Sequence, residues 1–140
     1  MILDCIHCGT QNRVPAARIA SVARCGRCKA AICPPERPLS VHSEADFDEL
    51  IRDAPVAVVV DFWAAWCGRC RAVAPELDKL ARTKAHAAIV AKIDTEAFPA
   101  VSGRYAVRSI PSMILFRAER EVERVSGAMS AAQIANELAR

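Results

Sequence analysis

Apolar and polar residues follow regular periods from about residue 41 onwards, but not before it. Apolar residues recur at helical spacing after Ser43, at Phe47, Leu50, Ile51 and Ala54, which predicts a helix that starts at this serine. The β-branched run at residues 56–62, V-A-V-V-V-D-F, predicts a strand that is covered on both faces. Helix and strand signals therefore alternate from the start of this region.

The pattern after residue 66 predicts further helices and strands in alternation. A helix is expected to begin at Cys67 and to be kinked by Pro75. Residues 88–94 predict a buried strand, residues 97–105 a short irregular helix, and residues 113–117 and 122–126 a hairpin. Ser130 and Gln133 form a capping box ahead of a last helix. The order αβαβαββα predicts an α/β fold, with a mixed central sheet and helices on both faces.

The first 33 residues differ from the rest, because they contain few large apolar side chains and no sustained periodicity. The segment P-P-E-R-P at residues 34–38 predicts a stiff, extended linker. We therefore expect a small module at residues 1–33, a proline-rich linker at 34–40 and a larger domain at 41–140.

Two Cys-x-x-Cys pairs in the small module are separated by 16 residues, as expected of a zinc site. So short a segment cannot bury enough apolar surface to fold alone, and a tetrahedral ion would supply the missing cross-links. Gly9 and Gly26 are expected where the backbone turns tightly beside the sulfurs. Two redox pairs or two disulfides are the alternatives. The expected ligands of one structural zinc ion are Cys5, Cys8, Cys25 and Cys28.

Composition narrows the class of protein. With 53% hydrophobic and 25% charged residues, the chain is expected to fold around a core. No apolar run is long enough to span a bilayer, and no secretory signal is recognisable. The seven cysteines, an odd number, favour metal or redox chemistry in a reducing compartment. We therefore expect a cytoplasmic protein without a membrane partner, and we expect it to be a monomer. Cys33 is expected to be a small buried residue or a free thiol.

Net positive charge is concentrated in residues 1–40, which contain six Lys or Arg residues and two acidic ones, a net of +4. Four thiolates around a zinc ion form an anionic cluster, which these cations would partly neutralise. Because no aromatic residues are interleaved with the cations, we prefer this explanation to a nucleic-acid partner.

A third pair, in W-C-G-R-C at residues 66–70, has no partner pair and lies between a buried strand and a helix. Cys67 would occupy the helix N-terminus, where free backbone N–H groups favour an anion. A thiolate is the attacking species in disulfide exchange. Cys70, one turn further into the helix, fits the role of the resolving thiol.

The segment D-F-W-A-A-W-C-G-R-C-R-A-V-A-P-E-L at residues 61–77 resembles the active-site segment of the thioredoxin family. A-K-I-D, S-I-P-S and a lone glycine, Gly127, match the rest of that family in order and spacing. The resemblance covers about residues 41–140 and, with the four-cysteine ribbon, is closest to the bacterial thioredoxin-2 subfamily. It implies a thioredoxin fold and a protein-disulfide reductase that is recharged by an NADPH-linked thioredoxin reductase.

The resemblance also assigns roles to individual residues. Asp61 would transfer a proton at Cys70, and Lys92 would tune Asp61; burial should raise the pKa of this carboxyl group. The Ile110–Pro111 bond would be cis and would lie against the disulfide. Trp63 is expected to pack beneath the site. The implied substrate groove consists of Trp66, Ile110, Pro111, Gly127 and Ala128.

Arg69 departs from the family pattern, which has proline between the two cysteines. With Gly68 it would tune the redox pair, because a cation beside Cys67 favours the thiolate and therefore the dithiol form. A modest upward shift in reduction potential is the expectation. Two alternatives stay open: a disulfide oxidase or isomerase tuned by Arg69, and a zinc-controlled binding or holdase chaperone module.

Overall fold

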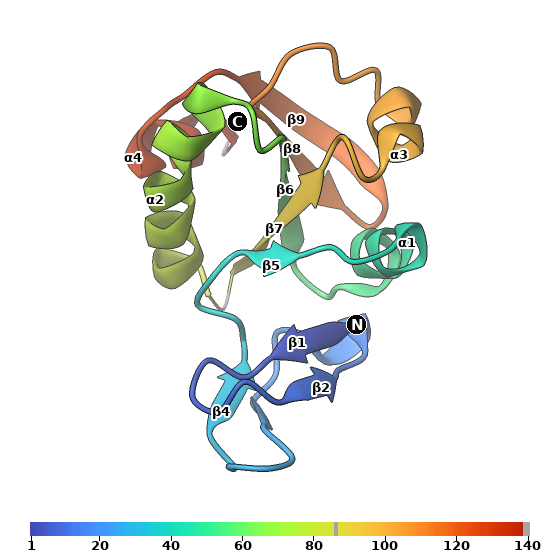
Figure 1. Ribbon diagram of the computed structural model, residues 1–140, viewed down its shortest axis with the longest axis vertical. Helices are drawn as coiled ribbons and strands as arrows, with labels where there is room; N and C mark the ends of the chain where they lie inside the picture. The colour runs from blue at the N-terminus through green and yellow to red at the C-terminus, as the bar shows by residue number, and fades with distance from the viewer. Residues whose placement is uncertain (86, 139–140) are drawn as a thin grey trace.

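The central sheet of this computed structural model, which describes residues 1–85 and 87–138, has five strands in the order β5-β7-β6-β8-β9 (Figure 1). β6 and β7 are buried parallel neighbours, and β5 pairs in parallel with β7. β8 pairs antiparallel with β6, and β9 pairs antiparallel with β8. The expected mixed sheet is confirmed. The strands are β5 (Leu39–Ser40), β6 (Ala57–Trp63), β7 (Ala88–Asp94), β8 (Ser112–Arg117) and β9 (Arg120–Ser126).

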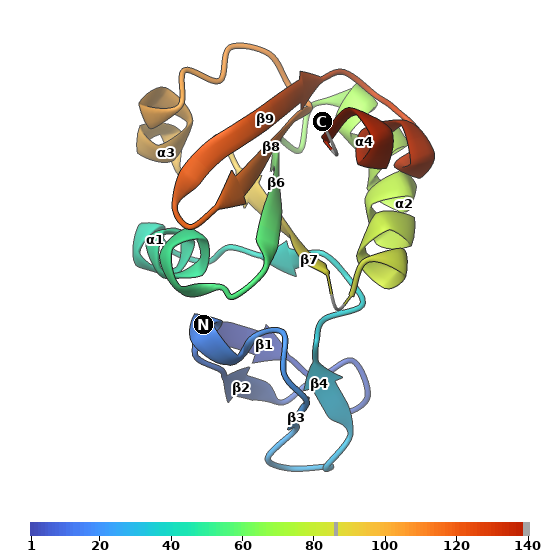
Figure 2. The same cartoon turned by 180° about the vertical axis from the view of Figure 1, so that it is seen from behind.

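Helices cover both faces of the sheet, as expected (Figures 1 and 2). α1 (Glu44–Asp53) and α3 (Pro99–Arg104) pack on the face that carries Val58, Val60 and Phe62 of β6. α2 (Gly68–Thr83) and α4 (Ala131–Leu138) pack on the face that carries Val59. Side chains alternate between the faces of a strand, so the buried run in β6 serves two separate cores.

Local capping interactions place the helix starts. The hydroxyl of Ser43 accepts the N–H of Asp46 at 3.0 Å and so caps α1. The predicted capping box of α4 is confirmed: Gln133 N–H donates to the Ser130 hydroxyl, and Ser130 N–H donates to the Gln133 side chain. α2 continues through Pro75 and spans 16 residues.

The N-terminal module, called the ribbon below, consists of two short hairpins. β1 (Ile2–Asp4) pairs with β2 (Gln11–Arg13), and β3 (Ala23–Arg24) pairs with β4 (Ala31–Cys33). A 3-10 turn, η1 (Ala16–Arg18), lies against α1, where Ala16 N–H donates to Glu49 Oε2 at 2.7 Å. The ribbon thus joins the core on the α1 side of the sheet, through Met1, Leu3, Val14, Ala16 and Ile19.

The segment expected as a linker ends in a strand. Leu39 and Ser40 form the edge strand β5, and Val41 N–H donates to Lys92 O at 2.9 Å. Cys33, just before the prolines, is only 3% exposed, and burial raises the pKa of its thiol to about 11. This agrees with its expected role as a small buried residue. No helix in the described part of the chain is both long enough and apolar enough to cross a membrane.

Candidate redox and metal sites

The pair at the N-terminus of α2 forms a disulfide. Cys67 and Cys70 have their Cα atoms 5.3 Å apart, and each is about 5% exposed. β6 ends at Trp63, the chain turns through Ala64, and Cys67 then occupies the N-cap of α2. The Cys67 sulfur accepts the backbone N–H of Cys70 at 3.2 Å. A buried strand and a helix start therefore place this sulfur where helix N–H groups favour negative charge.

The loop before β8, at the same end of the sheet as the start of α2, lies against the disulfide. The Ile110–Pro111 bond is cis, as predicted, and Ile110 O lies 3.8 Å from the Cys67 sulfur. Gly127 donates its N–H to Pro111 O at 2.9 Å and adopts a positive φ of 98°, which favours glycine. The structure thus brings Ile110, Pro111 and Gly127 to the disulfide, although 43 positions separate Ile110 from Cys67.

Trp66 forms the exposed border of this site. Its side chain is 67% exposed, and its indole N–H donates to Glu96 Oε1 at 2.9 Å. Glu96 follows β7, and its own N–H donates to Asp94 Oδ1. Glu96 is not among the site residues predicted from the sequence. Its position two residues after A-K-I-D, just past the predicted strand at residues 88–94, was the available signal. Ala128, the last member of the expected groove, is exposed.

Asp61 is a buried acid on the α2 face of the sheet. It is 1% exposed, lies beside Lys92 in the strand register, and its Oδ1 has no hydrogen-bond partner in the described chain. Burial raises the pKa of this carboxyl group to about 7, against a smaller lowering by Lys92. The expected rise in pKa is confirmed. Lys92 Nζ lies 5.0 Å from the centre of the Trp63 ring.

The four ribbon cysteines converge on one point, and their sulfurs all lie within 4.8 Å of one another. The Cys5–Cys28 and Cys8–Cys25 sulfur distances are 3.5 and 3.6 Å. A tetrahedron with zinc–sulfur bonds of about 2.3 Å has edges of about 3.8 Å. The donor set therefore fits a structural zinc ion with four thiolate ligands.

The two Cys-x-x-Cys turns share one backbone geometry. His7 N–H points at the Cys5 sulfur and Arg27 N–H at the Cys25 sulfur, both at 3.4 Å. Gly9 ends the first turn at φ 75°, and Lys29 ends the second at φ 65°. Gly26 lies within the second turn, as expected, but the left-handed position of that turn falls on Lys29.

Hydrogen bonds within the ribbon shift the pKa values of its thiols in both directions. The pKa of Cys25 is lowered to about 5, first by the N–H of Cys28 and then by the Asn12 side chain. Thr10 lowers the pKa of Cys8. Against a lowering by the N–H of Ala30, burial and hydrogen bonds with the other three thiols raise the pKa of Cys28 to about 11. Because the thiolate is the metal-binding form, the contacts of Cys8 and Cys25 favour a bound cation at these two positions.

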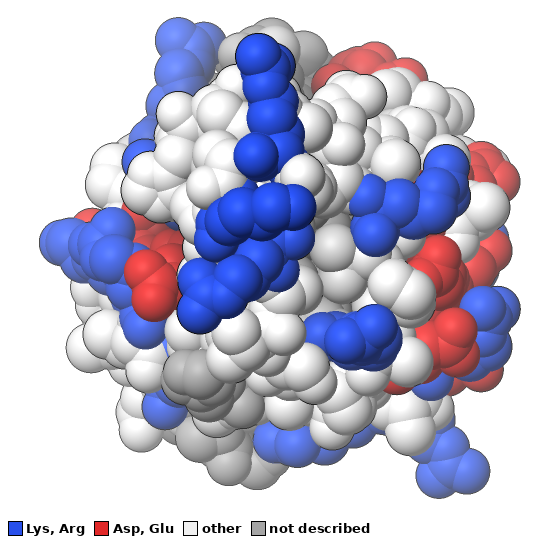
Figure 3. Space-filling view, turned by 90° about the horizontal axis from the view of Figure 1, so that it is seen from below, with Lys and Arg blue, Asp and Glu red and all other residues white. Residues whose placement is uncertain are grey.

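Basic side chains surround the cluster. Figure 3 shows Lys and Arg side chains spread over the end of the molecule that the ribbon forms. Lys29 Nζ donates to Gly26 O at 3.0 Å, and Arg24 donates to Lys29 O at 3.4 Å. Two of the cations are therefore held at the second cysteine turn, where they can offset the negative charge of a zinc–thiolate centre.

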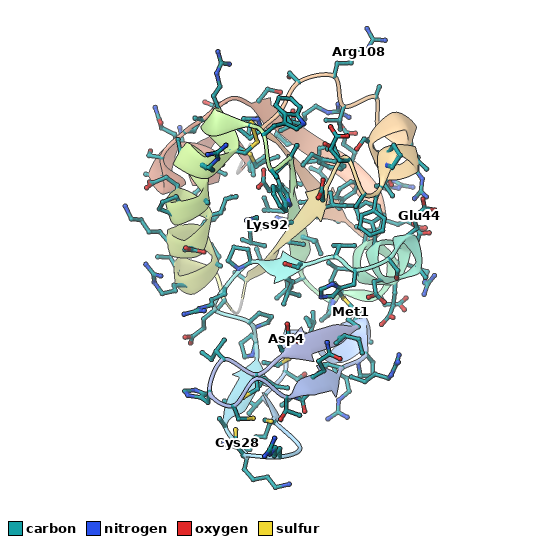
Figure 4. The ribbon with its side chains drawn as sticks, viewed as in Figure 1. Met1, Asp4, Cys28, Glu44, Lys92 and Arg108 are labelled. Carbon is teal, nitrogen blue, oxygen red and sulfur yellow. A yellow bond between two sulfur atoms is a disulfide. The ribbon has the colours of Figure 1, made fainter. Side chains whose placement is uncertain are left out.

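The metal site and the disulfide lie at opposite ends of the molecule. In Figure 4, Cys28 lies at the bottom, and Arg108, two residues before Ile110, lies at the top. The ribbon packs against α1 rather than against the start of α2. The ribbon therefore lies away from the disulfide in the described structure.

Fold and site together define a thiol–disulfide oxidoreductase with an attached zinc ribbon. The sequence model described as Thioredoxin matches residues 38–140, and the zinc-ribbon model described as Thioredoxin 2, N-terminal, matches residues 5–30. The chain belongs to the thioredoxin family. Thioredoxin is itself a standard example of a reactive Cys-x-x-Cys pair with a stabilised thiolate.

Individual relatives support the assignment of this chain to the thioredoxin family. The chain is 40% identical over 129 residues to Thioredoxin C-3 of Corynebacterium nephridii, covering 92% of this chain and 87% of that protein. It is 38% identical to Thioredoxin 1 of Synechococcus elongatus, covering 69% and 90%. Among solved structures, a mutant thioredoxin from Halobacterium salinarum matches with a TM-score of 0.67 at 33% identity, covering 73% and 88%.

Proposed function

We propose that Cys67 attacks protein disulfides and that Cys70 resolves the mixed disulfide. The observation that carries this assignment is the position of the Cys67 sulfur, at the N-cap of α2 and beside Ile110 O. In the reduced protein, the Cys67 thiolate bonds to one substrate sulfur while the substrate disulfide breaks and releases one thiolate. Cys70 then loses its proton and attacks the Cys67 sulfur. The Cys67–Cys70 disulfide forms, the second substrate thiolate leaves, and two electrons have passed to the substrate.

The substrate chain is proposed to lie across Trp66, Ile110, Pro111, Gly127 and Ala128. The Gly127 N–H contact to Pro111 holds two of these loops together beside the disulfide. An extended peptide could pair with the backbone of Ile110, as peptides pair with strand edges elsewhere. Trp66, which is exposed, would cover the apolar side chains that follow the substrate cysteine.

Asp61 is proposed to accept the proton of Cys70, with Lys92 tuning its charge. A base with a pKa of about 7 suits proton transfer near neutral pH. In Asp61→Asn, resolution of the mixed disulfide should slow by about tenfold at pH 8 and lose its rise with pH through about 7. Rapid-mixing kinetics of a preformed mixed disulfide would measure this. Asp78→Asn, at an exposed position on α2, is the matched control, and equal rates in all three proteins would contradict the proposal.

The same substitution, Asp61→Asn, should stabilise the fold. This result separates a functional role of Asp61 from a structural one, because replacing a residue that the fold needs would destabilise it. A pKa raised in the folded state means that stability falls as pH rises from about 4 to about 7, because the buried carboxyl group must then lose its proton. Asp61→Asn should therefore raise the free energy of unfolding by a few kcal/mol at pH 8, and by nearly nothing at pH 4. Urea unfolding at both pH values would test this.

Arg69 is proposed to raise the reduction potential of the pair slightly, together with Gly68, the first residue of α2. Arg69 is exposed, so screening limits the effect, and Arg69→Pro should lower the potential by about 5–20 mV. Equilibration against defined glutathione ratios, with zinc retained, would measure the potentials. An equal or higher potential in the variant would contradict the proposal. A wild-type potential well above the cytosolic glutathione value would favour the oxidase or isomerase alternative.

The proposed electron donor is an NADPH-linked thioredoxin reductase, and the proposed compartment is the cytoplasm. Membership of the thioredoxin family supports the donor, because this family works with such reductases. The four ribbon thiolates support the compartment, since they would oxidise where disulfides form readily.

One observation favours the binding-module alternative. A hollow of about 580 Å³ lies between the ribbon and the linker, next to the exposed side chains of Ile6 and Val22. Exposed apolar side chains around a hollow are typical of a surface that contacts other proteins. Under this alternative, the ribbon would capture proteins independently of Cys67 and Cys70.

A further inference from the structure

Three arginines lie near the disulfide, two in the first turn of α2 and one in the loop before β8. Arg69 and Arg71 belong to the first turn of α2, and Arg108 lies in the loop that precedes the cis bond. All three are exposed, and Figure 4 shows Arg108 projecting from the top of the molecule into solvent. Neither Arg69 nor Arg108 serves the fold through a contact that the structure describes.

Two of these arginines have free donor groups. Arg71 donates to Ala65 O at 3.2 Å. Within residues 1–85 and 87–138, Arg69 and Arg108 make no ion pair and no side-chain hydrogen bond. Each guanidinium group therefore keeps its full set of donors for a ligand.

Two acidic residues at this end of the molecule accept hydrogen bonds from neutral N–H groups and keep their negative charge. Glu96 accepts the Trp66 indole N–H, and Asp94 accepts the N–H of Glu96. The loops at residues 64–71, 105–111 and 126–130 contain no Asp or Glu. The charged side chains of these three loops are therefore all arginines: Arg69, Arg71 and Arg108.

Distances along the chain bring both free arginines within reach of a bound substrate. Ile110 O lies 3.8 Å from the Cys67 sulfur, and Arg108 is two residues earlier, so its Cα is at most about 7 Å from that of Ile110. Arg69 is two residues after Cys67. An extended substrate advances about 3.3 Å per residue, so residues within three positions of its reacting cysteine pass near both side chains.

We propose that Arg69 and Arg108 make this protein selective for disulfides whose cysteines have Asp or Glu within three residues. The inference rests on the proposed function, because it assumes that substrates approach Cys67 along Ile110. Arginine matches the planar carboxylate group with two parallel hydrogen bonds. Opposite charge also speeds the encounter of substrate and protein, and salt weakens this effect.

The test uses the full chain with zinc retained, reduced beforehand and freed of reductant. Three peptides with one internal disulfide differ only in the flanking residues, which are Asp, Ser or Lys. Single-turnover rates with each peptide are divided by the rate of the same peptide with free dithiothreitol, because flanking charge also alters the intrinsic reactivity of a disulfide. The normalised rate should be about tenfold higher for the Asp than for the Lys peptide at low salt, and less than about threefold higher at roughly 0.5 M salt.

Variants assign the preference to the two arginines. Arg69→Ala and Arg108→Ala should each reduce the ratio of Asp to Lys rates about threefold, and the double variant should bring it close to one. Arg120→Ala, at the exposed far end of the β8–β9 hairpin, is the matched control and should keep the ratio. The Ser peptide corrects each variant for a change in redox potential.

The outcomes separate this inference from the proposed function. Equal normalised rates for the three peptides, or a preference that survives in the double variant, would overturn the selectivity alone. If the reduced protein reduces no peptide, the proposed function fails, and the selectivity fails with it.

Discussion

Replacing Cys70 by serine should leave the protein covalently joined to its substrates and reduce turnover by at least about a thousandfold. Cys67 can still attack, but the sulfur that resolves the mixed disulfide is gone. In the described structure the remaining cysteines lie in the ribbon and at the linker, away from the start of α2. The adduct should appear as a band of higher mass on non-reducing gels and disappear with dithiothreitol.

Substitutions of the other cysteines serve as controls for this result. Cys67→Ser should be equally inactive but should form no adduct, because the attacking sulfur is absent. Cys33→Ala changes a buried cysteine remote from the disulfide and should keep normal turnover. Normal turnover in Cys70→Ser would contradict the assignment of the resolving thiol. Full biological activity in the Cys67→Ser, Cys70→Ser double variant would support the binding-module alternative instead.

Removing zinc should unfold the ribbon and destabilise, but not inactivate, the rest of the protein. The metal joins two hairpins that have little core of their own, and structural zinc can stabilise such a module by about 10 kcal/mol or more. Once the ribbon unfolds, the side chains that it packs against α1 are lost, among them Leu3 and Ile19. The melting temperature of the main domain should fall by about 5–10 °C. Disulfide reduction should persist, since the ribbon lies far from Cys67.

Chelation and Cys25→Ser both test this, with metal content, calorimetry and reductase activity as readouts. Cys33→Ala is the matched control and should retain one zinc per chain. An unchanged melting temperature after complete zinc loss would contradict the structural role of the ion. Loss of activity in a protein whose main domain stays folded would show that the ribbon acts on the redox site.

Elements with a local signal were predictable from the sequence. The helix starts follow from Ser43, Cys67 and Ser130, because capping depends on residues only three positions apart. The strands β6 and β7 follow from continuous apolar runs, which only a sheet covered on both faces explains. The zinc ligands follow from their spacing alone.

Short or non-local features were not predictable. The ribbon strands have two or three residues each, too few for a period, and the metal site rather than an apolar face organises them. β5 is an edge strand of two residues directly after Pro38, where composition indicates a linker. Lys29 adopts the left-handed conformation because it repeats the position of Gly9 in the other cysteine turn, although lysine has no preference for it.

The sequence by itself determined the chemical groups of this protein. They are two thiols at a helix start, four thiols with metal-ligand spacing, and a carboxyl group within an otherwise apolar strand. Only the tertiary structure decided which distant residues meet these groups. Ile110 beside Cys67, Gly127 on Pro111 and Glu96 on Trp66 are contacts between loops at the ends of different strands. Strand order and register bring these residues together. No local sequence pattern predicts the strand order or the register, because both result from packing two cores against one sheet.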